Sequence, residues 1–236
     1  MAAISNDPAC ELDPSWTLAV NRDAALNLAK LARESGVERF IFSSSCSVYG
    51  DGGDSMLDEG SDLHPISVYA KAKVEAEEQL MRMADTQFCT VSLRKATLYG
   101  LSPRMRFDLA VNIMTLKAVT ERRVYVTGGG QQWRPFLHVR DAAAAYIRCL
   151  DVPVERISGK CFNVVSSNWR IGDLAKLVSE RVRGAEVFVV PSDLDRRNYR
   201  ASGARFESAV GFRPVHTLEE GIDEIQAALR RGELAD

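Results

Sequence analysis

The pattern of apolar and polar positions predicts alternating helices and strands over the first hundred residues. Residues 17–35 carry apolar side chains at helical spacing and end at Gly36, a residue type that commonly stops helices. Residues 37–45 have a nearly continuous apolar character, which predicts a short strand covered on both faces. Residues 67–84 show the spacing of a long helix, and residues 88–100 that of a strand running into a loop. This order of elements predicts a parallel α/β sheet.

Beyond residue 100 the pattern is more mixed and indicates a smaller α+β lobe at the C-terminal end. Four segments have helical spacing, namely residues 106–121, 138–150, 171–182 and 217–231. Short strand-like runs lie between them, at residues 124–126, 160–165 and 186–190. The glycine-rich residues 50–60 and the charged residues 192–204 are predicted to be loops.

The composition excludes several classes of protein. Of the 236 residues, 46% are hydrophobic and 26% charged, which is typical of a globular domain with a sizeable core. The formal net charge of −2 offers no basic surface for nucleic acid or an anionic membrane, and no apolar run approaches the ~18 residues of a membrane span. The opening residues lack the features of a signal peptide, so we predict a cytoplasmic protein.

The cysteines and histidines indicate neither a metal centre nor a disulfide framework. The five cysteines and three histidines are scattered along the chain, and no CxxC motif occurs. Cysteines within apolar runs are typical of buried, reduced thiols. The sequence therefore predicts no metal site and a reducing compartment.

Candidate chemistry gathers around the stretch FSSSCSVYG, residues 42–50, which follows the predicted strand directly. Tyr69 comes 24 positions after Ser45, and Lys73 lies four positions further on one face of the predicted helix. A nearby ammonium stabilises a phenolate, so we expect the pKa of Tyr69 to fall from ~10 toward neutrality. A YxxxK pattern alone is weak evidence for a catalytic site, and the serine-rich strand end at this separation makes the evidence stronger. The three side chains together suit the removal of a proton from a substrate alcohol.

Several segments, in order, resemble the extended short-chain dehydrogenase/reductase family, which includes the nucleotide-sugar epimerases and dehydratases. They are VERFIFSSSCSVYG, LDEG, HPISVYAKAKVEAE, LRKATLYG, GGGQQWRPFLHVRDAAAAY, DRRNYRASGARFESAVGFRP and TLEEGIDE, which cover nearly the whole chain. The resemblance implies a partial Rossmann-like, doubly wound parallel sheet with a smaller α+β substrate lobe. Residues 1–100 would then be the C-terminal portion of an NAD-binding core, and residues 101–236 mainly the substrate lobe, with about 130–165 returning to the core.

The resemblance also assigns catalytic roles to four residues. Tyr69 matches the family's catalytic base, and Lys73 the residue that lowers its pKa and binds the nicotinamide ribose. Ser45 matches the hydroxyl that orients the substrate. Asn21 matches an asparagine that helps to hold a proton-relay water.

The cofactor implied by the resemblance is NAD, with NADP left open, and the implied substrate is a nucleotide-diphosphate sugar. Cofactor contacts are expected from Tyr69 and Lys73 and from small residues at the strand ends, namely Ala2, Ala3, Ser43, Ser44 and Ala96. Substrate contacts are expected from Ser45, Thr97, Arg134 and Arg197, with Arg196 as an alternative to Arg197. Guanidinium groups suit a diphosphate because their paired N–H donors match its oxygens.

The residues before the VYG motif argue against one activity of this family. The 4,6-dehydratases carry an Asp-Glu pair there, whereas this chain has Cys46 and Ser47. A thiol and a hydroxyl do not replace that acid and base at neutral pH, so dehydration is disfavoured.

The glycine-rich turn on which this family holds its dinucleotide is not found in the sequence. The opening MAAIS resembles the family's fourth strand, so we expect about 70 residues of a full-length relative to be missing. Weak or no NAD binding by this chain alone is therefore predicted. A truncated or mis-assigned start, a split enzyme and a pseudoenzyme all remain open as explanations.

The function that the resemblance implies is an NAD-dependent nucleotide-sugar epimerase acting at C4, in a homodimer, with the activity of this chain alone left open. One alternative is an NAD(P)H-dependent keto-sugar or carbonyl reductase, which would share the same three catalytic side chains. A second alternative is a non-catalytic protein that binds a nucleotide sugar or a partner.

Overall fold

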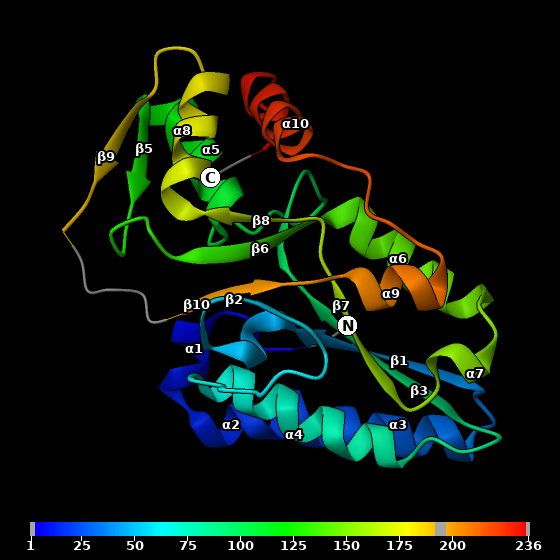
Figure 1. Ribbon diagram of the computed structural model, residues 1–236. Coiled ribbons are helices and arrows are strands. Elements are labelled where there is room, and N and C mark those ends of the chain that lie inside the picture. Colours follow the sequence, from blue (N-terminus) through cyan, green and yellow to red (C-terminus); the bar gives the residue numbers. More distant parts are fainter. Residues whose placement is uncertain (1–2, 192–196, 235–236) are drawn as a thin grey trace.

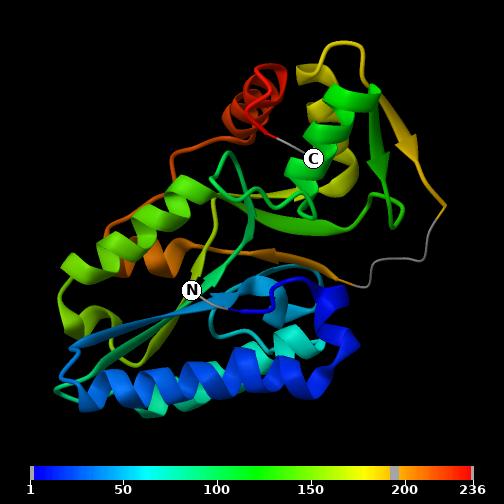
Figure 2. The ribbon, with the colours of Figure 1, turned by 180° about the vertical axis from the view of Figure 1, so that it is seen from behind.

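The computed structural model describes residues 3–191 and 197–234, which form two lobes (Figure 1). The lower lobe in this view holds a parallel sheet between two layers of helices, and the upper lobe is mainly helical. The view from behind shows the same two lobes, with β10 running along the boundary between them (Figure 2). The expected α/β fold is confirmed.

The sheet of the lower lobe consists of three parallel strands in the order β1-β3-β7. These strands are β1 (Arg39–Ser45), β3 (Cys89–Lys95) and β7 (Lys160–Val164). The helices α3 (Ala24–Glu34) and α4 (Val68–Arg82) cover one face, and α6 (Val139–Asp151) covers the other (Figure 1). The strand and helix predictions for residues 37–45, 67–84 and 160–165 are confirmed.

The chain before β1 is helical, as the spacing in residues 17–35 predicts. It contains α1 (Asp7–Leu12), α2 (Pro14–Leu18), a π-helical turn over Ala19–Asp23, and α3. The helix α1 is not predicted by the spacing. A strand at MAAIS is not observed over residues 3–5, because the N–H and C=O of Ile4 bond to the Asn21 side chain instead of a neighbouring strand.

Helices contact β1 from both faces, as expected, yet most of the strand is not fully buried. Only Phe42 and Ser44 are fully buried in it, and the other five residues are partly exposed. Among the described residues β1 pairs with β3 alone, so it lies at an edge of the sheet, where one flank has no strand neighbour.

The upper lobe packs three helices over short strands. The helices are α5 (Ala110–Glu121), α8 (Ile171–Arg181) and α10 (Leu218–Arg230). The strands form two small sheets, one of β4 (Thr97–Tyr99), β6 (Trp133–His138) and β8 (Ser167–Arg170), the other of β5 (Arg123–Val126) and β9 (Glu186–Val189). An apolar cluster that includes Val111, Phe136 and Ile222 forms the core of this lobe, separate from the cluster around β3 and β7. The position of the domain boundary stays a prediction.

The two segments predicted to be loops pair with each other as strands. Strand β2 (Asp51–Leu57) lies parallel to β10 (Asn198–Ala201), which continues into the short helix α9 (Ala204–Val210). A further short helix, α7 (Val154–Ile157), follows α6. The loop prediction is wrong because the pairing is non-local, and neither segment carries an alternating pattern that marks a strand.

The described part of the chain contains neither a membrane-spanning helix nor a cluster of metal ligands. No helix in residues 3–191 or 197–234 is long and apolar enough to cross a bilayer. No group of three or more potential metal ligands occurs in the same ranges.

Candidate functional site

A cavity of about 290 Å³ lies at the carboxyl ends of β1 and β3, where ligands commonly bind in parallel sheets. Ser45, Tyr69 and Lys73, predicted from the sequence as a catalytic trio, all line it. Its other lining residues come from the N-terminal segment, both strand ends and the upper lobe: Ala3, Ser5, Asp7, Ser43, Ser44, Ser47, Lys95, Ala96, Thr97, Leu98, Arg106, Leu109, Arg134, Arg197 and Tyr199. We call this cavity the catalytic pocket.

The serine-rich strand end presents hydroxyls to this pocket. The Ser45 hydroxyl accepts a hydrogen bond from the backbone N–H of Ser47 at 3.2 Å and so caps the 3₁₀ turn Cys46–Tyr49. Ser44 is only 1% exposed, and neither its hydroxyl nor that of Ser47 has a hydrogen-bond partner among the described residues. Buried polar groups are normally paired, and these two hydroxyl oxygens are exceptions that the surrounding protein encloses.

Tyr69 and Lys73 project from the first turns of α4, which is fixed at its start by the Ser67 side chain accepting from the N–H of Ala70. The Lys73 ammonium donates to the carbonyl of Ser43 at 2.9 Å and lies 5.5 Å from the centroid of the Tyr69 ring. The spacing of four positions therefore places both groups over the end of β1.

The expected lowering of the Tyr69 pKa is not observed. Burial raises the pKa of Tyr69 to about 12, and a hydrogen bond with Ser45 and the charge of Arg106 offset this only in part. The pKa of Lys73 is lowered to about 8, first by burial and then by the charge of Lys95. The effect of burial on the Tyr69 pKa outweighs that of the hydrogen bond and of the Arg106 charge, so the phenol keeps its proton at neutral pH.

Asn21 does not line the pocket. Its amide oxygen accepts from the N–H of Ile4 at 2.9 Å, and its amide nitrogen donates to the carbonyl of Ile4 at 2.8 Å. Both groups thus hold the segment that carries Ala3 to the pocket wall. Its expected role in a proton relay stays a prediction, and Ala2 lies outside the described residues.

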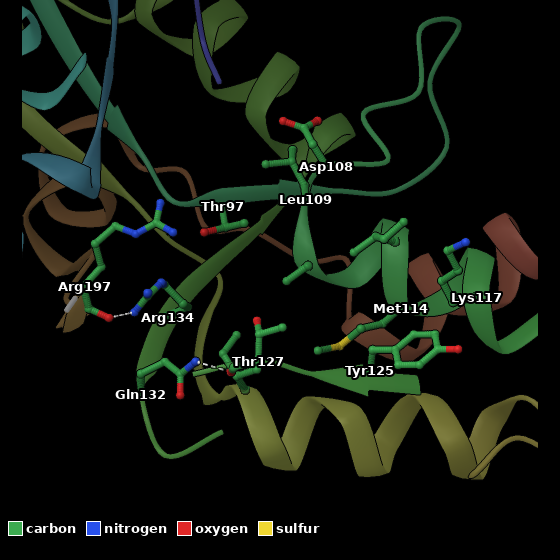
Figure 3. Close-up of a pocket in the computed structure, with 13 residues that line it drawn as sticks. Thr97, Asp108, Leu109, Met114, Lys117, Tyr125, Thr127, Gln132, Arg134 and Arg197 are labelled. Atoms are coloured by element: carbon green, nitrogen blue, oxygen red, sulfur yellow. Dashed lines mark hydrogen bonds between the residues drawn. The ribbon is translucent and has the colours of Figure 1, made fainter. Parts of the chain in front are cut away.

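A second cavity of about 380 Å³ adjoins the catalytic pocket and shares Thr97, Leu109, Arg134 and Arg197 with it. Figure 3 shows Arg134 and Arg197 together at one end of this cavity, with Met114, Tyr125 and Lys117 at the other. Its remaining lining residues are Asp108, Ala110, Ile113, Thr127, Gln132 and Ile171. We call it the upper pocket.

The two arginines predicted to bind a diphosphate stand where the pockets meet. Arg134 is buried and donates to the carbonyls of Trp133 and Arg197. Arg197 donates to the Asp7 carboxylate at 2.6 Å. Arg196, the alternative to Arg197, lies outside the described residues.

The sequence interpretation missed several charged residues of the pocket. Lys95 and Arg106 line it, as does Asp7, which accepts from Ser67 as well as from Arg197. Lys95 lies within the quoted segment LRKATLYG, where the predicted strand runs into a loop, and this position is the signal that the sequence offers. Asp7 and Arg106 reach the pocket only through the tertiary fold.

The thiol before the VYG motif lies outside the catalytic pocket. Cys46 is buried, contacts the carbonyl of Arg94 at 3.1 Å, and has its pKa raised by burial. A protonated thiol in an apolar environment offers neither a carboxylic acid nor a carboxylate. Ser47 does line the pocket, with a neutral hydroxyl.

Known proteins with similar sequences include a UDP-glucose epimerase and a GDP-sugar reductase. A profile of the NAD dependent epimerase/dehydratase family matches residues 1–165. An uncharacterised UDP-glucose epimerase of Bacillus subtilis strain 168 is 26% identical over 209 residues, which make up 86% of this chain and 64% of the relative. GDP-6-deoxy-D-mannose reductase of Pseudomonas aeruginosa is 27% identical over 226 residues, 90% of this chain and 73% of the relative.

A solved structure matches the fold over almost the full chain. The UDP-glucose 4-epimerase of Thermotoga maritima, solved with UDP-glucose, superposes with a TM-score of 0.87 at 24% identity, covering 99% of this chain and 77% of that one. This chain therefore spans about two thirds to three quarters of the length of these relatives. Because the family profile matches well over half of its residues, the chain belongs to the NAD-dependent epimerase/dehydratase family.

Proposed function

We propose that this protein acts on a nucleotide-diphosphate sugar as an epimerase that inverts one sugar carbinol, at C4. One observation carries the proposal: Ser45, Tyr69 and Lys73 line a pocket that continues past Arg134 and Arg197 into a second cavity. A sugar in the catalytic pocket would thus be joined through its diphosphate to a nucleoside in the upper pocket. The relatives named for UDP-glucose support this substrate class.

The residues of this chain have distinct tasks in the proposed reaction. Arg134 and Arg197 bind the diphosphate by charge-assisted hydrogen bonds and fix the distance of the sugar from α4. Ser45 holds the reacting oxygen in line with the Tyr69 phenol, with which it already shares a hydrogen bond. Tyr69 moves the proton of that oxygen, and the Lys73 ammonium stabilises the phenolate form.

The residues of the catalytic pocket fit the nicotinamide part of a dinucleotide. The ammonium of Lys73 offers a donor to a ribose, and the small side chains of Ala3, Ser44 and Ala96 leave room for the ring beside the strand ends. When bound, the cofactor supplies the acceptor and the donor of hydride. No glycine lines either pocket in the described residues, and weak or no binding of NAD by this chain alone stays our prediction.

A second candidate, a reductase of nucleotide-linked keto-sugars, is favoured by the name of one relative. The Pseudomonas aeruginosa relative is named GDP-6-deoxy-D-mannose reductase. A carbonyl reduction needs a proton donor, and the Tyr69 phenol, which keeps its proton at neutral pH, would serve as one. An epimerase uses the same phenol in both directions.

The experiment that tests the function combines binding with product analysis. The protein is incubated with UDP-glucose and NAD, and separately with a keto-sugar nucleotide and NADPH. An epimerase yields an epimer with no net change in cofactor, whereas a reductase consumes NADPH. The variant Tyr69→Phe should lose turnover while keeping UDP-glucose affinity. Near-normal turnover of that variant would remove Tyr69 from the mechanism, and binding without turnover in the unaltered protein would indicate a non-catalytic protein.

A further inference from the structure

Asp7 is a charged residue of the catalytic pocket to which neither the family resemblance nor the proposed mechanism assigns a role. It is the first residue of α1, and it lines the pocket together with Tyr69 and Arg197. Its side chain is 27% exposed, so a ligand that enters the pocket can reach the carboxylate. The negative charge of Asp7 is therefore part of the surface that a nucleotide ligand meets.

The two carboxylate oxygens of Asp7 have different partners. Oδ2 accepts a hydrogen bond from Nη1 of Arg197 at 2.6 Å, and Oδ1 accepts one from the hydroxyl of Ser67 at 3.0 Å. Ser67 caps the start of α4, two positions before Tyr69. Asp7 thus joins the start of the catalytic helix to one of the two arginines that stand where the pockets meet.

This ion pair engages an arginine that the proposed function gives to the diphosphate. Arg197 lines both pockets, so a diphosphate that joins a sugar in one to a nucleoside in the other would lie against its guanidinium. Of the two pockets, Asp7 lines only the catalytic one, and its carboxylate would lie beside the diphosphate there. Two negative groups that share one guanidinium repel each other, so binding of the ligand opposes the ion pair.

The charge of Asp7 also acts on the catalytic end of the pocket. Burial is the first cause of the raised pKa of Tyr69, and the negative charge of Asp7 raises this pKa further. A carboxylate that disfavours the phenolate form of Tyr69 disfavours other anions in the same pocket for the same reason.

We propose that Asp7 competes with the diphosphate of the nucleotide ligand for the guanidinium of Arg197, so that binding of the ligand opens the ion pair. The proposal rests on the proposed function for the position of the diphosphate at Arg134 and Arg197. Asp7 then sets the affinity of the protein for the diphosphate and takes no part in proton transfer. An epimer carries the same diphosphate as its substrate, so weaker binding of this group favours release of the product.

The test measures affinity by titration calorimetry on the full chain at pH 7, with UDP and uridine as separate probes. Asp7→Asn removes the charge but keeps an oxygen that can accept from Ser67. This variant should bind UDP about fivefold more tightly, because the ligand no longer has to open a partly exposed ion pair. Uridine, which carries no phosphate, should show no difference between the two proteins. The matched control Glu11→Gln removes a carboxylate of α1 that accepts from the N–H of Val68, and it should leave the UDP affinity unchanged.

A gain of affinity separates competition from damage to the fold, because a variant that only disturbs the pocket binds UDP more weakly. Asp7→Glu keeps the negative charge and should show no gain. Unchanged or weaker binding of UDP by Asp7→Asn would overturn the proposal, and so would an equal gain in Asp7→Glu or Glu11→Gln.

The same measurements separate this proposal from the proposed function. Failure of the unaltered protein to bind UDP would overturn both the competition and the position of the diphosphate. Tighter binding of UDP by Asp7→Asn in a protein that shows no turnover would support the competition and count against the proposed function alone.

Discussion

The buried ion pair between Arg94 and Glu77 fixes the catalytic helix to the sheet. Arg94 on β3 donates to both carboxylate oxygens of Glu77 on α4, at distances between 2.7 and 3.1 Å. The two side chains are 5% and 1% exposed. Tyr69, Lys73 and Glu77 are spaced by four along α4, so the pair anchors the face that carries the candidate catalytic groups.

Replacing Glu77 by Ala should destabilise the protein by about 3–5 kcal/mol, because it leaves the Arg94 guanidinium buried without a counter-charge. The hydrogen bond from Arg94 to the Tyr49 hydroxyl, at 3.2 Å, does not replace the lost charge. Replacing both partners by Met removes the unpaired charge and should cost far less than the single change. Equilibrium urea unfolding of the three proteins measures these differences.

The matched control is an exposed pair. Arg231 and Glu233, both more than half exposed, are joined at 2.6 Å, and Glu233→Ala should leave the midpoint of urea unfolding almost unchanged. A loss from Glu77→Ala no larger than that of the control would refute the reasoning. A double variant as unstable as the single one would likewise show that the pair acts through its packing and not through its charge.

Three further predictions follow from the pockets and the surface. Lys95→Met should have a higher melting temperature than the unaltered protein at pH 7, because burial lowers the pKa of Lys95 to about 8 in the native state. The difference in melting temperature should disappear as the pH rises from about 8 to about 10.5, where the lysine loses its charge first in the native and then in the unfolded state. A difference that does not change with pH would contradict this. Arg134→Ala should weaken UDP binding in calorimetry about tenfold, with the exposed Arg148→Ala unchanged; equal losses would contradict a role at the diphosphate. Trp16, 62% exposed on α2, should support the expected homodimer, so Trp16→Lys should lower the mass measured by light scattering, and an unchanged dimer would place the interface elsewhere.

The helices and central strands could be predicted from the sequence because their signals are local. The spacing in residues 67–84 predicts α4 and places Tyr69 and Lys73 on one face, as observed. The pairing of β2 with β10 could not be predicted, since contacting residues such as Asp54 and Arg200 are 146 positions apart. The two glycines of β2 also give the segment a composition that is typical of a loop.

The sequence predicted several of the residues that line the catalytic pocket, but it did not predict how their surroundings shift their pKa values. The sequence places an ammonium near the Tyr69 phenol but carries no measure of burial, which raises the pKa instead. The contact between Lys95 and Ser43 joins residues 52 positions apart, so no short motif contains it. Asn21 matches a motif position, yet both of its amide atoms are engaged by the backbone of Ile4.

The ion pair between Asp7 and Arg197 has a consequence for the order in which the protein is made. It joins residues 190 positions apart, and Arg197 immediately precedes β10. A chain emerging from the ribosome can form α1 to α4 and the pairing of β1 with β3 well before Arg197 is synthesised. Contacts of such long sequence separation form late, because closing the loop between them opposes their formation. The catalytic pocket is therefore completed only after the segment that carries Arg197 has emerged, when most of the upper lobe is already outside the ribosome.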